Sequence, residues 1–317
     1  MSSTIDRAAG RAAAPARRLQ THFAAVRLGF TWFGVKKTLS REQKQQAAET
    51  FDAEGEILTA AKKLLDTRDP SFANVSAVRN RAINYWRGAS LPYPEPGLRL
   101  IRHDRIEQFD LQMTDLEQEL IKAVAELDEH YAELKQSARQ RLGRLYDSAD
   151  YPQTLGGLFE IQWEFPSLAP PEYLLQLKPE LYEQEKARIA ARFDEAVKLA
   201  EQAFTAEFSR LITHLGERVS GSDDGKPRIF RDSAVDNLRE FFARFKDLSI
   251  NSNHQLVELV EQAQKLLKGV APQDLRESDP LRTRIASELS KMQSSLDDLL
   301  IERPRRRILR RQPEAAA

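Results

Sequence analysis

Cysteine is absent from the 317-residue chain. Its absence excludes disulfide bonds, thiol catalysis and thiolate zinc sites, and it fits the reducing conditions of the cytoplasm. Long apolar runs are also missing: no stretch approaches the roughly 20 residues of a membrane-spanning helix, and the mean hydropathy is -0.55. We therefore expect a cytoplasmic protein that does not enter a membrane.

The chain also lacks a net charge, because its 48 basic and 48 acidic side chains cancel. No overall field draws it toward nucleic acid or an anionic membrane, so such binding needs a local basic patch. The basic tail at residues 302–317 meets this condition with six arginines: Arg303, Arg305, Arg306, Arg307, Arg310 and Arg311. These side chains either bind nucleic-acid phosphates or form a solvated tail behind a helix C-terminus.

Motifs for catalysis and cofactors are missing as well. The sequence has no G-x-S-x-G or G-x-G-x-x-G pattern, and its five histidines lack the spacing of metal ligands. The segment from Gly221 to Lys226 ends in Gly-Lys, but position 220 is serine where a phosphate loop needs glycine, and Pro227 prevents a helix start. We expect a protein that is not an enzyme and holds no cofactor or metal.

A compact head with a small β element is expected to begin at residues 22–102. The preceding residues 1–21 are rich in arginine and alanine, which is typical of a transit peptide or a disordered lead, and we interpret them as a disordered lead. Apolar residues alternate from Phe23 to Val35, which predicts a β-strand. The apolar run from Leu98 to Ile101 predicts a second strand that pairs with the first.

Helices account for the rest of the head. Ser40 and Gln43 form a capping-box pattern that predicts a helix through about Leu65. Residues 226–301 form the second part of the head. Further helices are predicted at about 74–86, 233–247, 253–268 and, after an N-cap at Ser278, to about 301.

A long antiparallel helical hairpin is expected at residues 103–219. Apolar or small residues recur every three or four positions from Ile106 to Leu145, and again from Ile189 to Val219 with an eleven-residue period. Prolines and a Gly-Gly pair between these stretches force the chain to turn. The two periods favour a nearly straight arm, with helices about 60 Å long. The predicted fold class is therefore mainly α, with a coiled-coil arm projecting from a helical head.

The tip of this arm, at about residues 146–178, concentrates aromatic side chains. A thin hairpin has little core, so we expect some of them to be exposed and to bind a protein partner. The alternative is a tip that folds back on itself. The predicted partner-binding residues are Tyr151, Phe159, Trp163 and Phe165. Glu160 and Glu164 share one face of an extended segment, which would suit a carboxylate pair in a hydrolase, but a half-exposed surface is the simpler interpretation.

The segment WFGVKKTL at residues 32–39, followed by SREQ, resembles the start of an uncharacterised bacterial and phage family described only as a domain of unknown function. The later order is also similar: WRG at 86–88, a proline-rich link, a long helix, Tyr151-Pro152 and a second long helix. This resemblance spans most of residues 22–300. Genes of the family are often found near a MoxR-type AAA ATPase and a von Willebrand A-domain protein, which implies an accessory role beside a ring ATPase.

These features predict a non-enzymatic scaffold or adaptor whose arm and aromatic tip engage a protein partner, with an AAA ATPase and a von Willebrand A-domain protein as the implied system. The alternative function is a nucleic-acid clamp that uses the C-terminal arginines. Whether the arm pairs within one chain or between two chains of an oligomer stays open.

Overall fold

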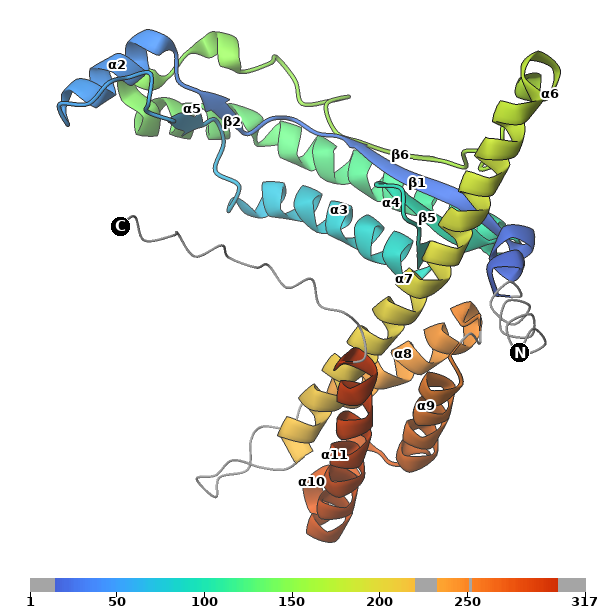
Figure 1. Ribbon diagram of the computed structural model, residues 1–317. Helices are drawn as coiled ribbons and strands as arrows, with labels where there is room; N and C mark the ends of the chain where they lie inside the picture. Colours follow the sequence, from blue (N-terminus) through green and yellow to red (C-terminus); the bar gives the residue numbers. More distant parts are fainter. Residues whose placement is uncertain (1–14, 220–232, 251–252, 302–317) are drawn as a thin grey trace, which may run out of the picture. The chain divides into compact units, whose positions relative to one another are not determined.

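The computed structural model describes residues 15–219, 233–250 and 253–301, most of which are helical (Figure 1). These residues divide into two compact units. Unit 2 holds residues 24–90 and 95–168, and unit 1 holds the described residues of 1–23, 91–94 and 169–317.

Unit 2 contains a small sheet in which β5 (Leu98–Arg102), β1 (Phe23–Thr31) and β6 (Glu160–Glu164) are consecutive strands. The predicted pairing of the first two strands is confirmed. β6 runs antiparallel to β1, with Arg27 opposite Glu164 and Thr31 opposite Glu160. The aromatic segment predicted as a tip thus includes a strand of the sheet.

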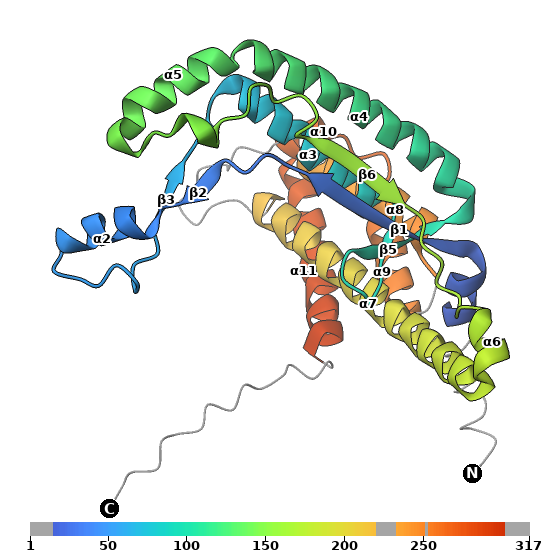
Figure 2. The ribbon, with the colours of Figure 1, turned by 90° about the horizontal axis from the view of Figure 1, so that it is seen from above.

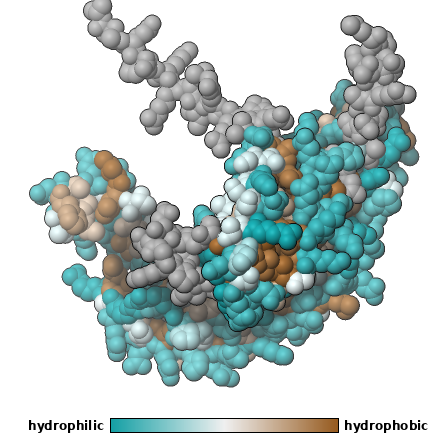
Figure 3. Space-filling view, turned by 90° about the horizontal axis from the view of Figure 1, so that it is seen from below, coloured by the Kyte–Doolittle hydropathy of each residue, from teal (hydrophilic) through white to brown (hydrophobic). Residues whose placement is uncertain are grey.

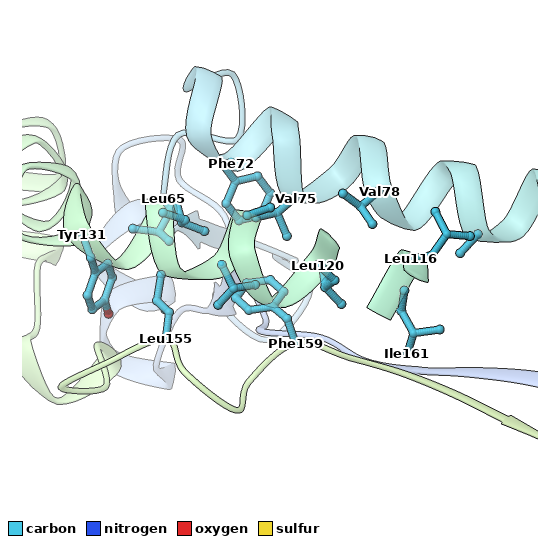
Figure 4. Packing of buried hydrophobic residues seen from close by; sticks show 14 of the residues in the cluster. Leu65, Phe72, Val75, Val78, Leu116, Leu120, Tyr131, Leu155, Phe159 and Ile161 are labelled. Atoms are coloured by element: carbon cyan, nitrogen blue, oxygen red, sulfur yellow. The ribbon is translucent and has the colours of Figure 1, made fainter. Parts of the chain in front are cut away.

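Two helices cover the core of unit 2. α3 (Pro70–Gly88) begins four residues earlier than predicted, because Asp69 caps its N-terminus and Pro70 occupies the first turn. α4 (Ile106–Glu129) packs along α3 and β6, and α5 (Tyr131–Leu142) follows after a break at His130. Figure 4 shows Phe159 and Ile161 directed toward side chains of α3 and α4. Short 3-10 turns lie at His103–Arg105, Gly143–Leu145 and Ser148–Asp150.

A two-stranded ribbon, β2 (Lys36–Thr38) with β3 (Ala61–Lys63), flanks α2 (Arg41–Glu49). The predicted capping box of α2 is confirmed, since Ser40 and Gln43 exchange hydrogen bonds in both directions. The prediction that this helix reaches Leu65 is wrong. α2 ends at Glu49, and the amide of Gly55 donates to the side chain of Gln45 as the chain returns to form β3. A Cβ at Gly55 would lie 2.8 Å from the Cα of Gln45, so only glycine permits this approach.

Unit 1 is a helical bundle around α7, which spans Pro179–Val219 as the sequence predicts. The other helices are α6 (Tyr173–Leu177), α8 (Ser233–Leu248), α9 (His254–Leu267), α10 (Pro272–Glu277) and α11 (Asp279–Ile301), and β4 (Leu91–Pro92) packs against α7. Figures 1 and 2 both show α11 beside α7. Phenylalanines fill the core: Phe208 of α7 stacks on Phe241 of α8 with ring centroids 5.2 Å apart. Residues 15–22 are helical and Leu19 is buried, so the expected disordered lead does not extend to residue 21.

The long antiparallel hairpin is not confirmed. The apolar stripe of α4 packs on α3, whereas that of α7 packs on α11 and α8. The stripes correctly predict that both helices have a buried face. An amphipathic stripe does not identify the element that covers it, so the pairing of α4 with α7 did not follow from the pattern.

Candidate functional site

The four aromatic residues predicted at the tip lie in different environments. Tyr151 and Phe159 are buried in the core of unit 2, where the Phe159 ring packs edge-on against Trp32 with centroids 4.9 Å apart. Trp163 is half-buried and donates from Nε1 to Oδ1 of Asp110 at 2.7 Å. Phe165 keeps 39% of its surface exposed. Tyr151 and Phe159 are therefore not available to a partner: the Tyr151 hydroxyl donates to the carbonyl of Leu64, and the Phe159 ring also packs edge-on against Phe72 of α3.

The other candidates are solvent-facing or lie outside the described residues. Glu160 and Glu164 are exposed on β6, and Glu164 is paired with Arg27 at 2.7 Å. The histidines His22, His103, His130, His214 and His254 are all exposed. Among the described residues, no group of three or more His, Asp or Glu side chains is arranged to hold a metal. The segment from Gly221 to Lys226 and the six tail arginines, Arg303 to Arg311, lie outside the described residues.

A buried ion cluster joins the β2–β3 ribbon to the turn before Tyr151. Asp150, whose side chain is 1% exposed, pairs with both Lys37 and Lys62. Lys62, at 5% exposure, approaches Oδ2 of Asp150 at 2.5 Å and donates to the carbonyl of Leu145 at 2.7 Å. Burial opposes ionisation of Asp150, but the hydrogen bond from Lys37 and the ion pair with Lys62 outweigh it and lower its pKa below the usual range. The cluster has a structural role, because the side chains of Asp150 and Lys62 are almost completely buried.

A recess opens between residues 63–68 and α5. Its volume is about 250 Å³, and it continues into an open groove of about 760 Å³ toward Ser71 and His130. The floor is apolar, formed by the buried Leu64, Leu65, Leu134 and Ala138, and the rim carries Lys63, Asp66, Arg68 and Arg141. We call this the α5 recess.

Asp66 fixes the two arginines of the α5 recess. It accepts from Nε and Nη2 of Arg68 at 3.2 Å each, and from Nη1 of Arg141 at 2.8 Å. These bonds hold the pKa of Asp66 well below its usual range. The hydrogen bond from Arg68 has the largest effect, and that from Arg141 follows. Asp66 is therefore ionised at neutral pH. The rim holds three cations and one anion, so its formal charge is +2.

A second surface lies on α6 of unit 1. Tyr173, Leu175 and Leu177 are 61%, 52% and 78% exposed, although all three are large and apolar. Isolated exposed apolar residues are common, and Figure 3 shows such residues in separate areas on one face of the molecule. Tyr173 and Leu177 lie four residues apart and share one face of the helix, whereas Leu175 lies on the opposite side, so α6 exposes apolar side chains on both sides. We call these three residues the α6 surface.

The sequence predicts neither surface. The α6 surface falls within the predicted tip, whose predicted partner-binding residues all precede it. Its signal was present as YLLQL next to a proline pair, a short apolar run with no amphipathic period. The α5 recess leaves no contiguous signal, because its rim joins residues 63–68 to Arg141.

Comparisons with protein families, with curated proteins and with solved structures found no match to this chain. Within the described ranges, no helix is both long and apolar enough to cross a membrane.

Proposed function

We propose that the protein is a non-enzymatic adaptor that binds a protein partner through the α6 surface. The observation that carries this proposal is the exposure of Tyr173, Leu175 and Leu177 within a single helical turn and a half. Fully burying a Leu side chain is favourable by about 1.5–3 kcal/mol, so an unfilled cluster of this kind gains from a partner. Exposed apolar clusters rimmed by polar residues are typical of protein-binding sites.

The start of α7, which packs with α6, is also incompletely buried. Of the α7 side chains, all of which are described, the first buried one is Phe193. The preceding fourteen residues, 179–192, include the half-buried Leu181, Tyr182 and Ile189. Apolar anchors along one helix suit a partner that lays a groove or a second helix against it.

The resemblance of residues 32–39 to a family encoded beside ring ATPases supports a specific partner class. An AAA ATPase or its von Willebrand A-domain companion would then bind the α6 surface. The absence of catalytic motifs in the sequence is consistent with an accessory role for this chain.

Site-specific photo-crosslinking in native-host cells tests the proposal. A photoreactive residue at Leu177 is expected to yield a discrete crosslinked partner, whereas the same residue at the exposed Gln184 is not. The variant L175S/L177S should abolish copurification of that partner. F51S/I57S is the matched control, because Phe51 and Ile57 are each 79% exposed in unit 2.

Equal crosslinking from Leu177 and Gln184, or loss of the partner only in the control variant, would overturn the proposed role of α6. Mass spectrometry of the crosslinked partner decides the partner class. A protein other than a ring ATPase or a von Willebrand A-domain protein contradicts that part of the proposal.

The alternative function, nucleic-acid binding through the tail, is favoured by six arginines within nine residues, from Arg303 to Arg311. Each neutralised phosphate adds about 0.9 to the slope of log affinity against log salt for duplex DNA. Gel shifts of the full chain and of a chain ending at residue 301 test it across a salt series. An unchanged slope after truncation contradicts the alternative.

A further inference from the structure

We propose that the α5 recess binds an acidic peptide segment, taking a carboxylate at its cationic rim and an adjacent apolar side chain on its floor. The site shares no residue with the α6 surface, so it can fail or succeed independently of the proposed adaptor role. Three features support it: the distribution of lysines on the β2–β3 ribbon, the fixed arginines and the shape of the recess.

The ribbon places four lysines in two directly opposed pairs. Lys37 lies opposite Lys62, and Lys36 lies opposite Lys63. Opposed residues of an antiparallel pair project to the same face, and like charges there repel. Neighbouring residues point to opposite faces, so the two pairs lie on different sides of the ribbon.

Only one of these two pairs has its counter-ion in the described part of the chain. Lys37 and Lys62 share Asp150. Lys36 and Lys63 are exposed and have no ion pair among the described residues, and Lys63 lines the α5 recess. An anion bound at the recess would balance the charge of Lys63, as Asp150 balances the charges of Lys37 and Lys62.

The two arginines of the rim, Arg68 and Arg141, are preorganised to bind such an anion. Asp66 occupies one edge of Arg68 and one nitrogen of Arg141, which limits the rotamers of both side chains. Arg68 and Arg141 remain 81% and 56% exposed, so further N–H groups face solvent. Guanidinium groups held in this way lose less entropy when they bind a carboxylate.

The shape suits a peptide, because a small recess of about 250 Å³ opens into a longer groove. The recess can take one bulky side chain with its neighbouring carboxylate. The adjoining open groove, about 760 Å³, is also lined by Asp69 and Glu133, so it suits an uncharged flanking backbone along α5 and repels a second acidic side chain.

Nuclear magnetic resonance of the full chain with labelled leucine methyls tests the proposal. The probes are the peptides acetyl-Gly-Phe-Asp-Gly-amide and acetyl-Gly-Phe-Asn-Gly-amide, which have the same shape and differ in one charge. The aspartate peptide should shift the methyls of Leu64, Leu65, Leu134 and Leu142 saturably, and bind about tenfold or more tightly than the asparagine peptide, as expected for a charge-assisted contact.

Charge variants locate the contact. K63E should lower the affinity for the aspartate peptide about fivefold or more, and K63R should leave this affinity unchanged. K122E is the matched control, because Lys122 is exposed on α4 and carries the same charge change. R141Q should also weaken binding, and an unchanged tryptophan emission spectrum of each variant shows that unit 2 is folded.

Three results would overturn the proposal. One is equal affinity for the two peptides, and another is equal loss of binding in K63E and K122E. The third is tighter binding of a ten-residue single-stranded oligonucleotide that displaces the peptide, since the recess would then be a phosphate site. Failure of α6 crosslinking leaves all of these readouts unaffected.

Discussion

The exchange of Asp150 for asparagine tests the buried ion cluster of unit 2. Asn keeps the shape of the side chain but removes the charge that balances Lys62, whose own side chain is only 5% exposed. Removing one partner of a buried ion pair costs about 3–5 kcal/mol, because the remaining charge is left in an apolar setting. Lys37 is 55% exposed and water can solvate it, so the loss of its pairing with Asp150 adds little to the destabilisation.

We therefore expect D150N to lower the free energy of unfolding by about 3 kcal/mol, at the lower end of that range. With a slope of about 2 kcal/mol per molar urea, the midpoint falls by roughly 1.5 M. Tryptophan fluorescence is a selective probe, since all three tryptophans, Trp32, Trp86 and Trp163, belong to unit 2.

The double variant K62M/D150N separates electrostatics from packing. It removes both buried charges, so most of the lost stability should return, apart from about 1 kcal/mol for the hydrogen bond from Lys62 to the carbonyl of Leu145. A D150N midpoint within about 0.3 M of the wild type would refute the reasoning. So would a double variant no more stable than D150N.

Three further predictions concern other parts of the chain. Acid should destabilise unit 2: the folded-state pKa values of Asp66 and Asp150 are lowered, so their stabilising contribution is complete above the unfolded pKa of about 4 and is lost as the pH falls below it. The urea midpoint of tryptophan fluorescence between pH 7 and pH 3 checks this, and a flat profile contradicts it. F208A should cost unit 1 about 3–5 kcal/mol, measured by far-ultraviolet circular dichroism, because Phe208 is fully buried; a loss below about 1 kcal/mol would contradict the aromatic core. G55A should increase hydrogen exchange across residues 41–57, because its Cβ collides with the Gln45 backbone, whereas G34A, with open space around it, should not; equal protection in both variants contradicts the close approach.

Local patterns predicted much of the secondary structure. β1, β5, the capping box at Ser40 and the bounds of α7 all followed from alternation, periodicity and cap chemistry, which act over a few residues. The long-range pairings did not follow. β6 pairs with β1 across 137 positions, from Arg27 to Glu164, and its five residues lie among prolines that suggested a turn.

The candidate sites were less predictable for the same reason. The pairs Lys36-Lys37 and Lys62-Lys63 are visible in the sequence, but only the register of β2 with β3 sorts them into a compensated and an uncompensated face. Exposure also depends on packing: Phe159 and Leu177 are both large and apolar, and only the fold shows that the first is buried and the second exposed. Residue type alone therefore does not show which apolar side chains are exposed.

The division of the chain has a consequence for synthesis. Unit 2 is an insertion within unit 1, because residues 15–23 belong with the helices after residue 169. Arg18 donates to the carbonyl of Ile250, 232 positions later. At about 5–20 residues per second, roughly 10 to 50 s separate the synthesis of these two residues. During that interval Leu19 has no completed bundle in which to bury. Unit 2 can complete its own core first, so the helix of residues 15–22 is among the last described elements to reach its native neighbours.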